Sequence, residues 1–255
     1  NNDVHIYLGT SAWVCAVSRN NTAFKNGAAA IQSADPENNL VVGITEAAGS
    51  NIQWIMEQFF SKERELYGDG IYAYMDKAIE SVPAGSDHLI CTPWMLGERC
   101  PVSNTTTRAT LFNINPEHTR VHLMRAVYEG IGYNLRWILE NFRSDYKIEC
   151  KHFHIIGGGA LDEAWMQIIA DITKVRFDVV DAPRSAGALG AAITAMIGLG
   201  KLKGFADAKK FVKVTKSYTP NPQNAEIYDK LFASYKDIYY SLRGAYKRAN
   251  GDRFN

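Results

Sequence analysis

Short apolar runs separated by turn residues occupy the first part of the chain. The runs 4–8 and 13–17 flank Gly9-Thr10-Ser11, a pattern typical of a β-hairpin. A further strand is predicted over 40–45, where small residues end it. The spacing of apolar residues then changes from two to three or four, which predicts helices over 52–60 and 72–82.

The second part of the chain alternates between strand-like and helix-like patterns. A strand over 89–91 and a polar loop over 93–119 precede a long amphipathic helix, for which Thr119 is the expected N-cap. The elements predicted after it are a strand over 153–156, a helix over 162–174, a strand over 176–180, a helix over 186–197 and an amphipathic tail helix over 227–242. Such alternation after a hairpin predicts the α/β class, with a mixed sheet flanked by helices.

Composition and charge exclude several classes of protein. Of 255 residues, 46% are hydrophobic and 22% are charged, which is a globular composition and excludes a disordered chain. The net charge of +1 gives no basic surplus for a nucleic-acid backbone, and no apolar run approaches the roughly 18 residues of a membrane span. The four cysteines are too few and too scattered for a disulfide framework or a zinc cluster. We therefore expect a cytoplasmic protein without nucleic-acid or membrane partners.

Three consecutive glycines, Gly157, Gly158 and Gly159, lie between a predicted strand and a predicted helix. Backbone N–H groups exposed in such a turn, together with the positive end of the helix, form a natural anion site. The absence of side chains would also let a ring or a phosphate approach the backbone. Taken alone, this motif is explained equally well by a tight turn without a ligand.

A dinucleotide-binding turn of an oxidoreductase is one alternative for this motif. Gly157 and Gly159 match the first two glycines of that fingerprint, and acidic residues follow about twenty positions later. The third glycine position, however, is Asp162, whose carboxylate would occupy the N–H groups that a pyrophosphate needs. The turn also lies deep in the chain and not at the start of a domain, so the motif disfavours an oxidoreductase.

Two other motifs of small residues have both a structural and a functional interpretation. Gly9-Thr10-Ser11 could grip a terminal phosphate at the hairpin tip, although such triplets are common in turns. Gly187 and Gly190, spaced i, i+3 and surrounded by alanines, would let their helix approach another backbone closely. We interpret this second motif mainly as helix packing.

Four motifs follow one another along the chain. They are the hairpin triplet 9–11, the loop 93–101 with Gly-Glu-Arg-Cys-Pro, the helix start 118–130, and the glycine turn with its helix, 157–171, followed by the small-residue helix at 187–192. In this order and spacing they resemble the C-terminal half of the FGGY carbohydrate kinases, over nearly the whole chain. They match that family's second phosphate-binding hairpin, its Gly-Glu-Arg-x-Pro loop, its central helix and its adenosine motif. The likeness is greatest to xylulokinase-like members.

The resemblance implies a fold, an activity and a set of ligands. The fold would be an actin-like, ribonuclease-H-like ATPase domain, with residues 1–255 as the C-terminal nucleotide-binding domain. The parent enzyme would transfer the γ-phosphate of ATP, bound with Mg²⁺, to a hydroxyl of xylulose or a related pentulose or polyol. ATP or ADP would bind mainly to this half, and the sugar mainly to an N-terminal half outside this chain. The alternatives are a non-catalytic actin-like ATPase or regulator and, less favoured, the oxidoreductase.

Residue by residue, the resemblance also implies a nucleotide site. Thr10, with the backbone of Gly9 and Ser11, would contact the β- and γ-phosphates. Gly158 and Gly159 would lie against the α-phosphate and the ribose, and Glu163 would reach toward the adenine. The predicted nucleotide-binding residues are Gly9, Thr10, Ser11, Gly157, Gly158, Gly159 and Glu163.

Some functional groups of the family are expected outside this chain. The family's general base is an aspartate in a Gly-Asp motif shortly before the hairpin, and it would accept the proton of the sugar hydroxyl. Asp3 lacks that glycine context, so no catalytic residue is assigned. The magnesium-binding acids would also lie in the N-terminal half. We therefore expect this chain to be a piece of a longer enzyme and to be inactive alone; the sequence leaves a homodimer open.

Other polar side chains give weaker signals. His118 and His122, spaced i, i+4, could chelate a metal but lack a third ligand in the sequence pattern. His152 and His154 share one face of a strand, and we interpret them as a solvated or hydrogen-bonded pair. For Arg99, a structural or hinge role is favoured over contact with a substrate phosphate.

Overall fold

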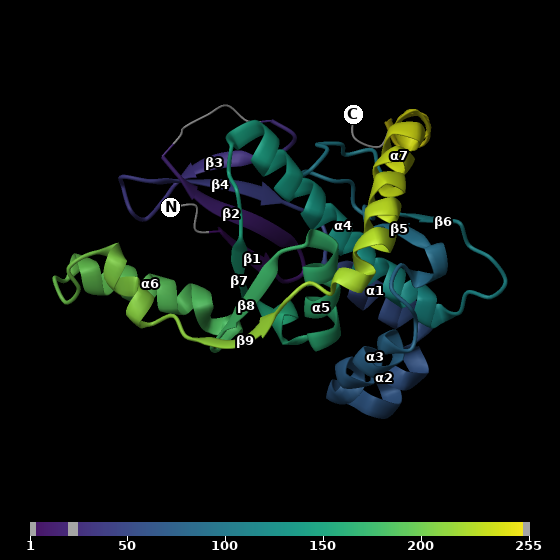
Figure 1. The fold of residues 1–255 in the computed structure, drawn as a ribbon, viewed down its shortest axis with the longest axis horizontal. Coiled ribbons are helices and arrows are strands. Elements are labelled where there is room, and N and C mark those ends of the chain that lie inside the picture. Colours follow the sequence, from purple (N-terminus) through teal and green to yellow (C-terminus); the bar gives the residue numbers. More distant parts are fainter. Residues whose placement is uncertain (1–3, 20–24, 252–255) are drawn as a thin grey trace.

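The fold is built on one large mixed sheet with a small two-stranded sheet beside it (Figure 1). The structure, a computed structural model, describes residues 4–19 and 25–251, so that Asp3 lies outside the described residues. The strands are β1 (Val4–Leu8), β2 (Ala12–Ser18), β3 (Ala29–Gln32), β4 (Asn39–Ile44), β5 (Ile90–Thr92), β6 (Thr110–Phe112), β7 (His152–Ile156), β8 (Arg176–Val180) and β9 (Val214–Tyr218). The helices are α1 (Gly49–Phe59), α2 (Ser61–Tyr67), α3 (Ile71–Glu80), α4 (Arg120–Tyr146), α5 (Glu163–Thr173), α6 (Ala186–Gly198) and α7 (Ala225–Asn250).

The order of the strands brings distant parts of the chain together. The large sheet has the order β3-β4-β2-β1-β7-β8-β9. Its centre is parallel, because β7 pairs in parallel with both β1 and β8, whereas β2, β3, β4 and β9 join through antiparallel pairs. The carboxyl ends of β1 and β7 therefore meet at one edge of the sheet, and so do the hairpin tip and the glycine turn that follow them.

The hydrophobic core lies against one face of this sheet. In β1 the residues Val4, Ile6 and Leu8 are buried, and Phe153 and Ile155 of β7 continue the same face. The helices α4 and α5 pack on each other and contact the sheet, while α7 packs along them. The alternate residues of β1 and β7, including His5 and His154, lie on the opposite face, since side chains alternate along a strand.

Most of the predicted elements are present in the structure. The hairpin, the strand–turn–helix unit at 152–173 and the long helix α4 are confirmed, and Thr119 precedes α4 with its N–H and hydroxyl both bonded to the His122 ring at 3.2 and 2.9 Å. The elements that the patterns missed are α2, β3, β6 and β9. The helix α2 has no buried residue, and β9 is exposed along most of its length. Elements that bury so few side chains have no regular spacing of apolar residues by which the sequence could reveal them.

The packing interpretation of the small-residue helix is wrong. In α6 only Ile193 is buried, and the helix projects away from the large sheet (Figure 1). A Cβ atom built on Gly187 or Gly190 would have no heavy atom of the described residues within 4 Å. Small residues permit a close approach between backbones but do not cause one. Neither α6 nor any other helix in the described ranges is long and apolar enough to cross a bilayer.

Candidate functional site

A cavity of about 410 Å³ lies where the hairpin tip faces the glycine turn. It forms at the shared edge where β1 and β7 end side by side. The helices α1, α3 and α5, together with Leu161, Asp162 and Arg184 from the turns beside them, contribute the remaining walls. Its lining residues are Gly9, Thr10, Gly49, Ile52, Gln53, Tyr72, Ala73, Asp76, Gly158, Gly159, Leu161, Asp162, Trp165 and Arg184.

Backbone hydrogen bonds hold the hairpin tip against the start of α1. Gly9 N–H donates to the Ser11 carbonyl at 2.9 Å, while Ala48 N–H donates to the Thr10 carbonyl and Gly49 N–H to the Gly9 carbonyl, at 2.8 and 2.9 Å. A Cβ atom on Gly49 would lie 2.5 Å from the Gly9 oxygen, so only glycine allows this approach. The first N–H groups of α1 are thus used within the chain, and Thr10 lies exposed in the cavity wall.

Two of the three turn glycines serve packing. Gly157 has φ +96°, and a Cβ atom there would lie 2.3 Å from the Leu8 carbonyl oxygen. A Cβ atom on Gly159 would lie 2.6 Å from the Trp165 ring. These two glycines therefore let the turn fit against β1 and α5.

The middle glycine leaves open space at the cavity. The nearest heavy atom to a Cβ atom built on Gly158 is Arg184 Nε, at 3.7 Å, which is an ordinary van der Waals contact. The backbone at Gly158 is thus accessible from the cavity, next to an exposed guanidinium. An accessible backbone beside a cation suits an anionic group.

Four of the seven predicted nucleotide-binding residues line this cavity. Gly9, Thr10, Gly158 and Gly159 do so, and Ser11, Gly157 and Glu163 do not. Glu163 is the first residue of α5; its side chain is exposed and pairs with Lys216 Nζ at 2.5 Å. The contacts of all seven with a nucleotide stay predictions.

Two carboxyl groups meet in the wall of the cavity. Asp162 caps α5, since its Oδ1 accepts a hydrogen bond from Trp165 N–H at 2.8 Å and its Oδ2 one from the Tyr128 hydroxyl at 2.9 Å. Burial, followed by a hydrogen bond to Asp76, raises the pKa of Asp162 well above its usual range, and burial also raises the pKa of Asp76. With both groups ionised, Asp76 Oδ1 is buried without a hydrogen-bond partner among the described groups. A proton shared between the two carboxyls would satisfy this oxygen.

We expect Asp162→Asn to make the protein more stable at pH 7–8, by about 1–3 kcal/mol of unfolding free energy. Asparagine is an equally good N-cap and can donate to Asp76 without a shared proton. Because the folded-state pKa of Asp162 is raised, its favourable contribution is complete below about pH 4 and is lost as the pH rises. Urea unfolding at pH 4 to 8 should therefore show equal stabilities at pH 4 and a widening gap above it. A constant gap, as expected for the exposed control Asp237→Asn, would contradict the shared proton.

Several lining residues carried no identifiable signal in the sequence. Gln53 and Asp76 lie outside the apolar period of their helices, and Tyr72, which belongs to that period in the sequence, is exposed at the cavity. Their position beside the glycine turn depends on how α1 and α3 pack. Trp165 Nε1 is buried without a partner among the described groups, and it stays unsatisfied even when Asp76 and Asp162 share a proton. Such atoms are often explained by a missing ligand or water.

The Gly-Glu-Arg-Cys-Pro loop has a structural role within this chain. Glu98 is buried; its Oε1 accepts hydrogen bonds from Glu46 N–H at 2.7 Å and Arg99 N–H at 2.9 Å, and its Oε2 one from Asn134 Nδ2 at 2.8 Å. Arg99 Nε pairs with the Glu46 carboxylate at 2.5 Å. The loop therefore ties the segment after β4 to α4, which supports the structural interpretation of Arg99. None of these residues lines the cavity of about 410 Å³.

Curated relatives of this chain are sugar kinases. The chain is 33% identical to the xylulose kinase of Bacillus subtilis (strain 168) over 201 residues, which are 78% of this chain and 38% of that relative. It is 28% identical to the gluconokinase of Bacillus licheniformis over 214 residues, 82% of this chain and 42% of that relative. The chain thus spans less than half the length of these curated relatives.

Solved structures and a family model agree with these likenesses. The xylulose kinase from Lactobacillus acidophilus superposes with a TM-score of 0.85 at 24% identity, and that from Rhodospirillum rubrum with 0.83 at 27%; each match covers 96% of this chain and 48% of the other. The mixed sheet flanked by helices is therefore the actin-like ATPase fold, which confirms the predicted class. The model of the FGGY family of carbohydrate kinases, C-terminal domain, matches residues 4–199. The chain belongs to the FGGY family of carbohydrate kinases.

Proposed function

We propose that this chain is the nucleotide-binding half of an ATP-dependent kinase that phosphorylates a hydroxyl of xylulose or a related sugar. The observation that carries the proposal is the cavity in which Thr10 of the hairpin tip faces Gly158 of the glycine turn. Membership of the carbohydrate kinase family supports the reaction class. The xylulose kinases among the relatives support the sugar, while the gluconokinase among them keeps related substrates open.

The phosphates of ATP would lie between the hairpin tip and the glycine turn. The Thr10 hydroxyl and the Gly158 backbone offer polar contacts, and Arg184 adds a positive charge at the same wall. The first N–H groups of α1 and α5 are satisfied by the hairpin carbonyls and by Asp162. The chain would therefore hold phosphate through its turns and not through a helix N-terminus, unlike a dinucleotide-binding turn.

The rest of the cavity suits the nucleoside. Ile52, Leu161 and the Trp165 ring give apolar surface for a flat base, while Gln53 and Asp76 offer amide and carboxyl groups. The unsatisfied Trp165 Nε1 is in this part of the wall. An apolar pocket with a few polar groups is the usual form of a cofactor site.

The residues of this chain would bind and orient the nucleotide but would not complete the reaction. ATP supplies the phosphoryl group, and Mg²⁺ spreads the negative charge that develops during the transfer. We place the magnesium-binding acids, the general base and most sugar contacts on the other half of the parent enzyme. This chain's task is then to fix the phosphates for a hydroxyl that the other half presents.

We expect calorimetric titration of this chain to detect ATP and ADP binding, and Gly158→Val to weaken it at least about 10-fold. Gly158 is the most informative position for this substitution. A side chain there would fill the cavity without meeting the backbone, so it should block the nucleotide without disturbing the fold. A matched control is Gly187→Val, where the added side chain meets open space. The same samples should show no xylulose-dependent formation of ADP.

Three results would contradict this proposal. One is binding of NAD in preference to ATP, which an oxidoreductase would show. Another is ATP binding that is equally strong in Gly158→Val and Gly187→Val. The third is turnover by the purified chain, which would place the catalytic residues within it.

A further inference from the structure

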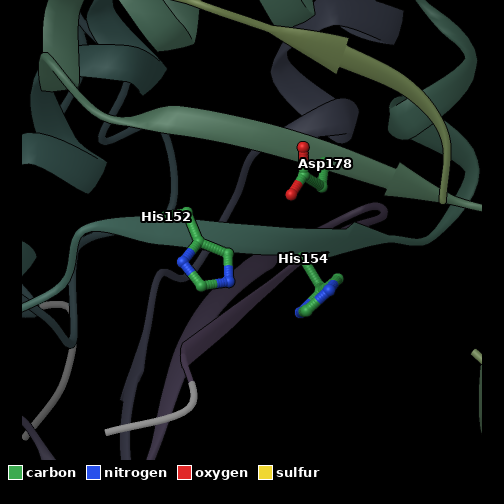
Figure 2. A group of neighbouring side chains, drawn as sticks. All are labelled: His152, His154 and Asp178. Carbon is green, nitrogen blue, oxygen red and sulfur yellow. The ribbon is translucent and has the colours of Figure 1, made fainter. Parts of the chain in front are cut away.

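Three metal-binding side chains gather on the sheet face opposite the core. His152 and His154 lie two residues apart on β7, and Asp178 is the cross-strand partner of His154 on β8 (Figure 2). One ligand atom from each lies within 4.8 Å of the other two. In the described parts of the chain, no other group of three or more His, Cys, Asp or Glu side chains is arranged to hold a metal ion.

The carboxylate of this cluster is already oriented. Asp178 is buried, and its Oδ1 accepts hydrogen bonds from Arg176 Nε at 2.9 Å and from Ser217 Oγ at 2.6 Å. Both bonds fall on Oδ1, so Oδ2 can bind a cation while the outer groups hold the side chain. Outer hydrogen bonds of this kind fix the ligands of natural metal sites.

Rotation of the two imidazole rings can bring the three ligand atoms as close together as a bound zinc ion requires. Zinc bonds of about 2.0–2.2 Å in a tetrahedral site place neighbouring ligand atoms about 3.3 Å apart. His152 is exposed and His154 is half-buried, so rotation of their rings can contract the cluster. Three protein ligands would leave a fourth position for water.

A second set of two histidines and an aspartate shows what distinguishes this cluster. The Nδ1 atom of His118 accepts a hydrogen bond from Asn115 N–H at 3.0 Å, and its Nε2 atom contacts the Asp87 carbonyl oxygen at 3.1 Å. His122 bonds the Thr119 N–H at 3.2 Å and the Asp87 carboxylate at 2.9 Å. The ring nitrogens of both are therefore engaged in hydrogen bonds at the start of α4.

We propose that His152, His154 and Asp178 form a binding site for a divalent transition metal of the zinc type. Imidazole ligands favour zinc, nickel, cobalt or copper over magnesium. The cluster begins at the amino end of β7, whereas the glycine turn follows its carboxyl end, so this ion is not the magnesium of a bound nucleotide. The site is independent of the proposed kinase reaction.

The test is a titration of the tag-free chain with Zn²⁺ against a chromophoric chelator, and with Co²⁺ by visible absorption. We expect one Zn²⁺ per chain and an intense tetrahedral Co²⁺ band. His152→Ala and His154→Ala should each lower the affinity for Zn²⁺ at least about 10-fold. Even the loss of a residue that only hydrogen-bonds to a metal ligand lowers metal affinity about 10–100-fold. The matched control is His118→Gln with His122→Gln, because glutamine also completes a capping box.

Any of three results would overturn the proposal. One is the absence of stoichiometric Zn²⁺ binding by the unaltered chain. Another is equal Zn²⁺ affinity in the His152 and His154 variants and in the unaltered chain, with far-ultraviolet circular dichroism showing all of them folded. Loss of binding in the His118/His122 control alone would place the ion at α4 and contradict the assignment.

Discussion

Glu129→Ala is expected to lower the free energy of unfolding by about 3–5 kcal/mol. Glu129 is buried in α4. Its Oε1 accepts hydrogen bonds from Gly85 N–H at 2.9 Å, from Arg125 Nε at 2.8 Å and from the Tyr228 hydroxyl at 3.0 Å. Its Oε2 accepts from Ser86 Oγ at 2.8 Å. In the alanine variant, the buried guanidinium of Arg125 would lose the Glu129 carboxylate that neutralises its charge. Urea unfolding of the two proteins measures the difference.

A matched control comes from a partly exposed glutamate on the same helix. Glu140 pairs with Lys236 Nζ at 3.0 Å in a partly exposed position, so Glu140→Ala should cost about 0–1 kcal/mol. The double change Arg125→Met with Glu129→Leu should recover much of the loss, because it removes both buried charges. Equal effects of Glu129→Ala and Glu140→Ala would contradict the assigned role.

Gly157→Ala is expected to lower the free energy of unfolding by about 3–5 kcal/mol and to abolish nucleotide binding. Its φ of +96° and ψ of 174° lie in a region that essentially only glycine occupies. The new Cβ atom would also lie 2.3 Å from the Leu8 carbonyl oxygen, at the end of β1. Relief of that contact requires β1 and the glycine turn to separate. Urea unfolding and ATP calorimetry on the same variant measure both effects.

The neighbouring glycine provides the control for this prediction. Gly158→Ala adds the same methyl group where only the Arg184 side chain is near, so stability should change by less than about 1 kcal/mol. Similar losses in the Gly157 and Gly158 variants would show that the turn is not held against β1 in the way the structure indicates.

The sequence predicted those parts of the fold that bury many apolar side chains. The strands β1 and β7 bury alternate residues, and α5 and β8 are buried along most of their length, so all four contain apolar residues in a recognisable pattern. The helix α2 and the strand β9 are mostly exposed and carry no such period. For α6, the spacing of Gly187 and Gly190 among alanines suggested close packing, but whether a helix is covered depends on its neighbours in space.

Some residues of the candidate site could also be predicted from the sequence, and others could not. Gly9, Thr10, Gly158 and Gly159 belong to local motifs whose turn geometry can be recognised in the sequence. Gly49 is needed because its Cβ would meet the Gly9 carbonyl, forty residues earlier in the chain. Asp76 became notable only through its burial against Asp162. Such roles arise from contacts between distant segments and leave no local pattern.

The parallel pairing of β1 with β7 also affects how the protein folds. It joins segments about 150 residues apart, and closing so long a loop costs chain entropy that local helices do not. The cavity is therefore absent from any partly folded species in which helices have formed but this pairing has not. A nucleotide that binds there would slow unfolding and leave the folding rate unchanged. It would extend the lifetime of the folded chain against proteases without raising the yield of folding.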